Sequence, residues 1–421
     1  MLESTSIESV HARKIYNGRG EETLEVEVLT LDGFGRSSAP SGKSRGREEA
    51  IPYPGDVVDA AVVAVHERIG PELEGLHADE QGMIDLRLHE LDGTRNFSSI
   101  GGNTACAVSF AVADAAAATI GIPLCQHLGG PLSVKIPTPL GNILCGGKHA
   151  GKNTPDIQEF LVLPIGATSF AQAAKANFTA HAELGGLLSK IDPHFTGGRG
   201  DEGAWAPHVD STRALEALSR ICEMVSDRES VRLRPCLDMA ASSLWNEKEE
   251  KYEYVNERTK RDRGEQIEYT LELISTYGLA YVEDPLMEED FEGFAELTKK
   301  AKGCLICGDD LFVTAIDRLQ KGIALSSARA VIVKPNQIGT ISDARETAMV
   351  AMKNGYVPVI SHRSGEGCDS TISHLAVAFG CPIIKCGVVG GERTAKINEL
   401  IRIEETLGHL AKMSDLTIIS G

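Results

Sequence analysis

The chain has 421 residues, enough for one barrel domain of about 250 residues and a smaller second domain. Its formal net charge of −18 argues against a nucleic-acid partner, whose phosphates would be repelled, and suits a soluble protein that binds cations. The N-terminus has neither the basic nor the apolar region of a secretory signal, and no run approaches the roughly 20 apolar residues of a membrane span. We therefore expect a cytoplasmic protein without a membrane partner.

The ten cysteines lie mostly in apolar runs and are expected to be small buried hydrophobic residues in a reducing compartment. Cys304 and Cys307 have the spacing of a redox or zinc motif. We discount that function because both intervening residues are apolar and the chain offers no second pair.

Residues 1–135 are predicted to form an α+β N-terminal capping domain. Alternating apolar residues over 24–31 meet Asp32 and Gly33, which is a strong β-hairpin signal. Helical patterns follow over residues 57–69, 79–91 and 103–120. Prolines at 131, 137 and 139 mark the boundary, so that residues 136–421 form the second domain.

The second domain is predicted to begin irregularly. Two apolar strands, over 139–144 and 158–164, are separated by a glycine-rich loop, 146–151, with no helix between them, as in a hairpin. A helix is expected over 171–190. The charged segment 246–266 mixes Lys and Glu and is expected to be a solvated surface segment.

Six later apolar runs with helical segments between them are typical of a parallel sheet covered on both faces. The polar residues that end these runs are Asp238, Glu283, Asp309, Lys334, His362 and Lys385. In a (β/α)8 barrel such strand ends converge on the active site. Three acids can hold a hard divalent cation and lysines can move a proton beside it. Any one of these residues alone is more simply a helix cap or a solvated charge, but six in succession are not.

Nine motifs, in order, resemble those of the enolase family over nearly the whole chain. The motifs span residues 146–151, 157–160, 200–203, 237–242, 282–285, 308–311, 334–340, 361–366 and 384–385. The resemblance implies an enolase-type (β/α)8 barrel with rearranged first units, two strands and two helices before the regular βα units, behind an α+β domain. It also implies a homodimer or larger assembly.

The implied reaction is a magnesium-dependent elimination of water from 2-phosphoglycerate to give phosphoenolpyruvate. By resemblance, the metal ligands are Asp238, Glu283 and Asp309 for one Mg²⁺ ion and Ser44 for a second ion. Lys334 is the expected base, with its pKa lowered by magnesium and Lys385; Glu202, with Glu159 nearby, is the expected acid. The expected substrate-binding residues are His149, Gln158, His362, Arg363, Ser364 and Lys385.

Several alternatives stay open at this point. Asp310 could replace Asp309 as the ligand, Glu159 and His149 could be bystanders, and His362 could be a structural hydrogen-bonding residue. Lys43 and Arg45 stand in a loop where the family has neutral residues. They are either plain surface charge or readers of a more negative substrate, such as the carboxyphosphono analogue handled by carboxyphosphonoenolpyruvate synthase. A non-catalytic enolase-fold protein is less favoured, because none of the expected acids or lysines is missing.

Overall fold

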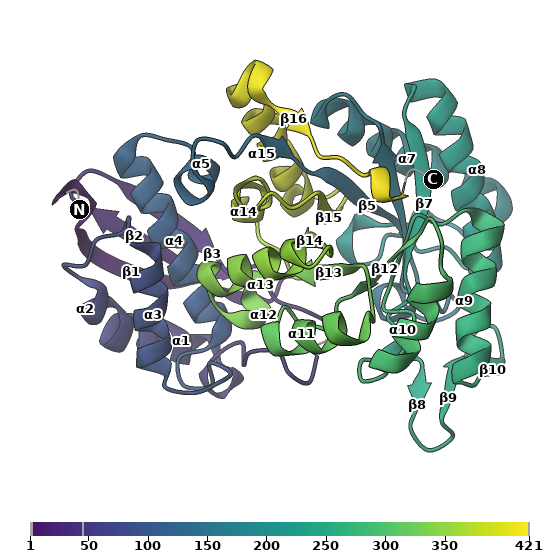
Figure 1. The fold of residues 1–421 in the computed structure, drawn as a ribbon, viewed down its shortest axis with the longest axis horizontal. Coiled ribbons are helices and arrows are strands. Elements are labelled where there is room, and N and C mark those ends of the chain that lie inside the picture. Colours follow the sequence, from purple (N-terminus) through teal and green to yellow (C-terminus); the bar gives the residue numbers. More distant parts are fainter. Residues whose placement is uncertain (1–2, 44–45, 420–421) are drawn as a thin grey trace.

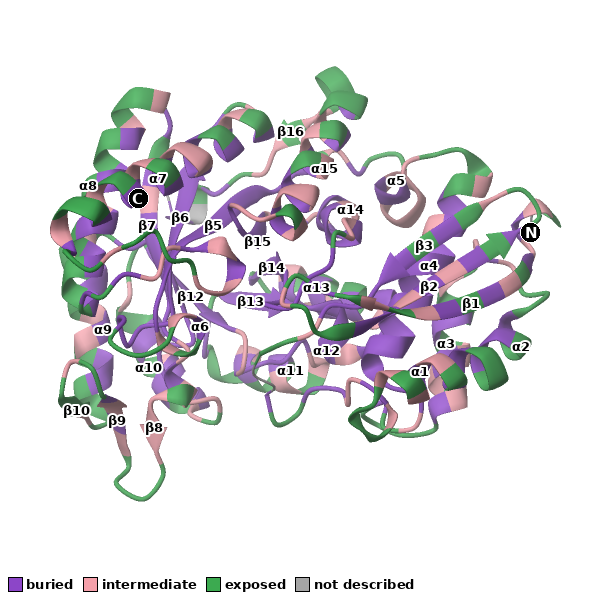
Figure 2. Cartoon of the chain, turned by 180° about the vertical axis from the view of Figure 1, so that it is seen from behind, coloured by how far each residue is buried: buried purple, intermediate pink, exposed green. Residues whose placement is uncertain are grey.

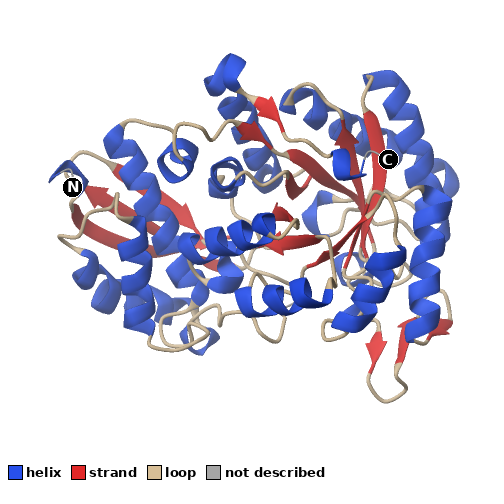
Figure 3. Ribbon diagram, in the orientation of Figure 1, coloured by secondary structure: helices blue, strands red, loops and turns tan. Residues whose placement is uncertain are grey.

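The structure, a computed structural model, describes residues 3–43 and 46–419. It consists of an N-terminal sheet covered by helices and a closed eight-stranded barrel surrounded by helices (Figure 1). The strands of the barrel meet at its centre and the helices form an outer ring, with the N-terminal domain beside it (Figure 3). The enolase-type architecture predicted from the sequence is confirmed.

The N-terminal sheet is antiparallel, with strands in the order β1 (Ile7–Tyr16), β2 (Glu22–Thr30) and β3 (Phe34–Ser38). Along β2 the apolar residues Leu24, Val26 and Val28 are fully buried, and the glutamates between them are partly exposed on the other face. This alternation has the two-residue period of a half-buried strand. The hairpin expected at Asp32 and Gly33 joins β2 to β3.

The buried face of this sheet packs against α4 (Gly102–Ile120). A Cβ on Gly35 of β3 would lie 2.1 Å from the carbonyl oxygen of Ala111, so only glycine allows the strand to approach the helix this closely. By length and composition alone α4 is apolar enough to cross a membrane, which our sequence analysis did not anticipate. However, 78% of its apolar window is buried inside the structure, as in the core helix of a soluble protein.

The other N-terminal helices follow the predicted patterns with one difference. The helix expected over 79–91 is α3 (Gln81–Asp92). The helix expected over 57–69 is α1 (Val58–Ala64), which passes through a π-helical turn at Val65–Ile69 into α2 (Gly70–Leu73). Before the barrel come α5 (Leu124–Gly129) and the short β4 (Lys135–Ile136), which pairs with β16 (Lys412–Met413).

The barrel closes in the order β11-β12-β13-β14-β15-β5-β6-β7. Its strands are β5 (Thr138–Cys145), β6 (Glu159–Ile165), β7 (Arg232–Asp238), β11 (Tyr281–Glu283), β12 (Leu305–Gly308), β13 (Ala330–Val333), β14 (Val357–Ser361) and β15 (Ile383–Gly387). Only β6 runs antiparallel to its neighbours, β5 and β7; all other neighbouring pairs among these described strands are parallel. The irregular start predicted from the sequence is therefore confirmed.

Two long helices, α7 (Phe170–Ile191) and α8 (Ser211–Glu229), separate β6 from β7, and six βα units follow. The helices of those units are α9 (Arg263–Tyr277), α10 (Phe291–Lys300), α11 (Ile316–Leu325), α13 (Ile341–Lys353), α14 (Thr371–Phe379) and α15 (Gly391–Leu407), with a short α12 (Pro335–Ile338) after β13.

One local expectation needs correction. The glycine-rich loop after β5 is not free of helix, because one turn, α6 (Gly147–Ala150), forms there. The charged segment 246–266 is mostly exposed or partly exposed, as expected for a surface segment. It contributes to a small sheet of β8 (Trp245–Asn246), β9 (Lys251–Tyr254) and β10 (Thr259–Arg261) that projects from the barrel (Figure 1).

Apolar side chains fill the barrel interior below the mouth, among them Leu161, Ile332 and Val359. Apart from the start of β7, where Arg232 is exposed and Arg234 is partly buried, the barrel strands are buried along their length, while the barrel helices are exposed on their outward faces (Figure 2). All ten cysteines are unpaired; nine are buried and Cys368 is exposed. Because apolar side chains fill the barrel interior, polar side chains can gather only at the strand ends.

An ion pair between the outer helices makes stability depend on pH. His374 of α14 lies 3.1 Å from Glu399 of α15. Burial lowers the pKa of His374, but the Cys125 thiol and Glu399 raise it more, to about 9. The hydrogen bond from His374 is the main reason that the pKa of Glu399 falls to about 2.

The first prediction concerns the Glu399→Gln variant, which removes this pair. Protonated His374 is favoured in the folded state, so its stabilising contribution is complete below its ordinary pKa of 6.5 and is lost as pH rises through about 9. The ionised Glu399 contributes above its ordinary pKa of 4.5 and loses that contribution as pH falls toward 2. Denaturant unfolding should therefore show the largest difference between wild type and variant from pH 4.5 to 6.5. A difference that does not shrink toward pH 9 would contradict this account.

Candidate active site

Strand register brings the predicted acids and lysines to one mouth of the barrel. Asp238 ends β7 and is in register with Glu283 on one side and with Glu159 on the other. Because β6 is antiparallel, Glu159 at its start lies at the same end as the other strands' last residues. Lys385 of β15 is in register with Ser361 at the end of β14.

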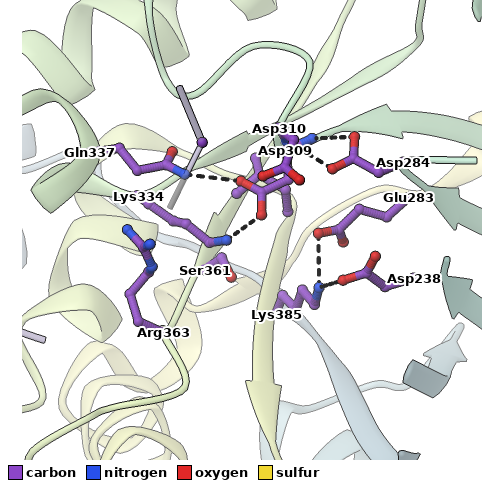
Figure 4. A network of polar contacts seen from close by, with 12 residues as sticks. Asp238, Glu283, Asp284, Asp309, Asp310, Lys334, Gln337, Ser361, Arg363 and Lys385 are labelled. Carbon is purple, nitrogen blue, oxygen red and sulfur yellow. Dashed lines mark hydrogen bonds and ion pairs between the residues drawn. The ribbon is translucent and has the colours of Figure 1, made fainter. Parts of the chain in front are cut away.

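Lys385 lies among three carboxylates, two of which, Asp238 and Glu283, are labelled in Figure 4. Its Nζ is 2.8 Å from Asp238 Oδ2, 2.8 Å from Glu283 Oε1 and 3.1 Å from Glu159 Oε2. Burial lowers the pKa of Lys385, but the three acids, Asp238 foremost, raise it well above its usual value. Burial raises the pKa of Glu283 well above its usual range, and the hydroxyl of Tyr281 donates to it at 2.7 Å.

Lys334 forms a second ion pair across the mouth, with Asp309 (Figure 4). The Gln337 amide also donates to Asp309, at 3.2 Å. Burial and the nearby cations lower the pKa of Lys334, yet the carboxylate of Asp309 raises it and the net direction is upward. This direction is opposite to the lowering that the sequence analysis expects with magnesium bound, because the charges of Asp309 and Glu283 outweigh burial and the neighbouring cations.

The two adjacent acids, Asp309 and Asp310, have different surroundings. Burial tends to raise the pKa of Asp309, but Lys334 lowers it further, so that the net direction is downward. For Asp310, burial and the charge of Asp309 raise the pKa to about 7. The backbone N–H groups of both residues donate to the Asp284 carboxylate at 3.0 and 2.8 Å, which fixes their loop.

Glu202 lies across the mouth on a tight turn, Asp201–Gly203, with a left-handed φ of 66°. Its carboxylate accepts a hydrogen bond from the Asn142 amide at 3.0 Å and lies 3.1 Å from Nε2 of His362. Burial raises the pKa of Glu202, but the neighbouring donors and cations, led by His362, lower it well below its usual value. On the other side, His149 Nδ1 lies 3.2 Å from Glu159.

The predicted substrate-binding side chains are partly engaged with protein groups. Arg363 forms a buried ion pair with Glu49, with both of its terminal nitrogens 3.0 Å from Glu49 Oε2. The Ser364 hydroxyl accepts from the backbone N–H of Lys43 at 2.8 Å. The Lys43 ammonium group lies 2.8 Å from Asp201. Ser44 and Arg45 lie outside the described residues.

These groups surround a polar cleft. The predicted residues that line it are Lys43, His149, Gln158, Glu159, Glu202, Asp238, Asp309, Lys334, His362, Arg363, Ser364 and Lys385, with Asp310 beside them. Glu283 lies behind this lining and is fully buried. The structure thus gathers the described part of the predicted site into one place.

The donor groups suit a hard divalent cation. Asp238, Glu283 and Asp309 offer only carboxylate oxygens, the ligands that magnesium prefers. The ammonium group of Lys385 pairs with Asp238 and Glu283, and that of Lys334 pairs with Asp309. Each of these carboxylates therefore has a positive charge beside it. Within the described residues, two groups of three candidate ligands have their ligand atoms within 4.8 Å of one another: Asp284, Asp309 and Asp310, and His149, Glu159 and Glu202. Asp238 and Glu283 converge instead on Lys385.

Several residues at the site were missed by sequence reasoning. Glu49 and Asn142 carry no local signal, because their partners are distant in the chain. Arg393 contacts His362 and was also missed, although a signal existed: it falls, with Lys396, on the otherwise apolar face of α15. Charged residues on a buried stripe are uncommon unless they have a partner.

Fold and site together define a barrel enzyme with buried carboxylates and lysines at the carboxyl ends of its strands. Family models described as "Enolase, N-terminal domain" and "Enolase, C-terminal TIM barrel domain" match residues 7–128 and 133–419. Proteins named enolase from Methanothermobacter thermautotrophicus and Methanosphaera stadtmanae are 52% and 53% identical, with 97% and 95% of this chain and 99% and 97% of those proteins aligned. An enolase from Pyrobaculum aerophilum is 45% identical over 96% of this chain and 98% of that protein.

The chain therefore belongs to the enolase family. It is a carbon–oxygen lyase of the hydro-lyase class, as the sequence resemblance predicted.

Proposed function

We propose that the chain eliminates water from 2-phosphoglycerate to give phosphoenolpyruvate, with the residue roles given below. The observation that carries this proposal is the set of buried ion pairs at the barrel mouth, in which Lys334 and Lys385 face the acids that follow β7, β11 and β12. Membership of the enolase family supports the same reaction.

The physical difficulty is to remove a proton from carbon beside a carboxylate that is already negative. Two bound Mg²⁺ ions would neutralise the negative charge that develops on the substrate carboxylate. Asp238, Glu283 and Asp309 would hold the first ion, and Ser44, outside the described residues, would contribute to the second. Lys385 would add a fixed positive charge beside the substrate carboxylate.

The chain's own groups would then divide the proton transfers between them. Lys334, in its neutral form, would take the proton from C2. Glu202, assisted by Glu159, would give a proton to the departing hydroxyl group, so that it leaves as water. Both residues line the same cleft; Lys334 follows β13, and Glu202 lies on the turn at 201–203.

The remaining polar groups would hold the substrate. Arg363 and Ser364 would bind the phosphate, because a planar guanidinium group matches phosphate oxygens. His149 and Gln158 would line the cleft from α6 and from the residue before β6. His362 would act on Glu202, which it contacts.

A more negative carboxyphosphono substrate is not favoured. The relatives that match over nearly the full chain are named enolase. Lys43, one of the two cations that motivated that alternative, lies in an ion pair with Asp201, so its charge already has a protein partner.

We further propose a domain division at 135/136, a cytoplasmic location and a homodimer or larger assembly. Separate family matches that end at 128 and begin at 133 support the division, and family resemblance supports the assembly.

The second prediction assigns the metal ligand. Asp309→Asn should weaken Mg²⁺ binding by more than about tenfold, a loss that removal of even an outer partner of a metal site can cause. Asp310→Asn is the matched control and should change Mg²⁺ affinity by much less, because its pKa of about 7 leaves it partly protonated. Titration calorimetry without substrate measures both. The reverse order would make Asp310 the ligand.

The third prediction separates the base from the acid. Lys334→Ala should abolish exchange of the substrate C2 hydrogen with deuterium from the solvent, because no other group takes that proton. Glu202→Gln should keep C2 exchange and lose elimination, because the hydroxyl group departs after the proton is removed.

Proton magnetic resonance of 2-phosphoglycerate measures the exchange, and phosphoenolpyruvate formation measures the elimination. Exchange at the wild-type rate in Lys334→Ala would exclude Lys334 as the base. Equal loss of exchange in both variants would show that the two roles are not divided in this way.

A further inference from the structure

Two buried cations on α15 lie where its apolar face meets the barrel. Arg393 and Lys396 are each 1% exposed, on the same side of the helix as the buried Ile397, Leu400 and Ile403. A buried charge is strongly unfavourable unless it is paired and hydrogen-bonded. The contacts of these two side chains therefore show which segment of the chain α15 fixes in place.

Both cations bind the loop after β14, but they bind different halves of it. Arg393 donates to the carbonyl oxygens of Arg363 and Ser364, each at 2.6 Å. Lys396 lies 2.9 Å from Glu366 and donates to the carbonyls of Gly367 and Asp369 at 2.9 and 2.6 Å.

Arg393 additionally reaches a side chain of the active site. The Nη1 atom of Arg393 lies 2.7 Å from Nδ1 of His362. A guanidinium group can only donate, so Nδ1 must accept, and the backbone N–H of Gly387 points at the same nitrogen from 3.4 Å. When Nδ1 accepts, the proton of a neutral imidazole lies on Nε2.

That nitrogen lies beside Glu202: His362 Nε2 is 3.1 Å from Glu202 Oε2. Burial lowers the pKa of His362 to about 4; the charge of Glu202 raises it, and the charge of Arg393 lowers it. The ring is therefore neutral near pH 7 and keeps its Nε2 proton beside the Glu202 carboxylate, which accepts a hydrogen bond from the Asn142 amide at 3.0 Å.

We infer that Arg393 is a positioning residue for dehydration, which holds His362 with its proton on Nε2 and thereby fixes and stabilises the carboxylate of Glu202. This inference rests on the acid role proposed above for Glu202. When Glu202 gives its proton to the departing hydroxyl group, the carbon–oxygen bond breaks, water forms and Glu202 becomes a carboxylate. The Nε2–H of His362 and the Asn142 amide, both beside that carboxylate, then stabilise the charge formed in this step. With the opposite tautomer, a lone pair of His362 would face the negative charge.

A plain structural role for Arg393 makes a different prediction. If it only anchored the loop at 362–369, its loss would disturb Arg363 and Ser364 and impair every step that needs bound substrate. Lys396 provides the matched control, because it has the same charge, helix, burial and loop but binds the half of the loop away from His362.

The test measures C2 exchange and phosphoenolpyruvate formation in wild type, Arg393→Gln and Lys396→Gln, with 2-phosphoglycerate and Mg²⁺. Arg393→Gln should lower the rate of elimination about tenfold to a hundredfold, the range found when an outer hydrogen-bond partner is removed. Its exchange rate should fall by a smaller factor, because the lost bonds to the Arg363 and Ser364 carbonyls affect both steps whereas the lost contact with His362 affects elimination alone. Lys396→Gln should lower exchange and elimination in the same proportion. In a His362→Gln background, Arg393→Gln should add little further loss, because it acts through that ring.

Circular dichroism checks the fold of each variant. If Arg393→Gln does not fold, Arg393→Lys keeps the charge but lacks the planar fork that reaches Nδ1 and two carbonyls at once, so it should show the same selective loss. Proportional loss of exchange and elimination in the folded Arg393 variant, as in Lys396→Gln, would overturn the inference and leave the proposed reaction intact. A wild-type protein that neither exchanges nor dehydrates 2-phosphoglycerate would instead overturn the proposed function itself.

Discussion

The site depends on one buried ammonium group held among three carboxylates. Lys385 is only 3% exposed, and Asp238, Glu283 and Glu159 surround it within 3.1 Å. A buried cation requires such partners, and buried acids require a cation in return. Three acids around one lysine offer more carboxylate oxygens than one ammonium group can pair with, and such hard oxygen ligands can bind a divalent cation. The same charges that hold the mouth together therefore prepare it for a substrate with a carboxylate and a phosphate.

Backbone geometry makes this cluster possible. The antiparallel β6 brings Glu159 into register with Asp238, whereas a parallel strand would place its first residue at the other end of the barrel. Gly387 of β15 allows the Glu202 turn to approach, since a Cβ there would lie 2.3 Å from the Glu202 carbonyl oxygen. Behind the mouth, α15 fixes the loop that carries His362 and Arg363. Each acid or base is thus held by the strand, turn or helix next to it.

Much of this could be predicted from the sequence, because continuous apolar runs ending in polar residues indicate parallel strands with converging ends. The hairpin-like start of the barrel was also predictable, from two strands separated by a short glycine-rich loop. The one-turn helix α6 and the small sheet around 245–261 were not, because short elements depend on tertiary packing more than on propensity. Nor could the sequence choose between Asp309 and Asp310, or pair Arg363 with Glu49, since both depend on contacts between distant segments. Arg393 and Lys396 could have been identified from the sequence, because they are charged residues on an otherwise apolar face of a helix.

The most direct test of the account compares initial rates of the wild-type protein with 2-phosphoglycerate and with the carboxyphosphono analogue, each with excess Mg²⁺. The arrangement of Lys334, Lys385 and Glu202 around one small polar cleft, and the ion pair that already engages Lys43, predict a higher kcat/KM for 2-phosphoglycerate. Phosphoenolpyruvate should accumulate in proportion to the substrate consumed. Preference for the carboxyphosphono analogue, or no turnover of 2-phosphoglycerate by the folded protein, would contradict the account.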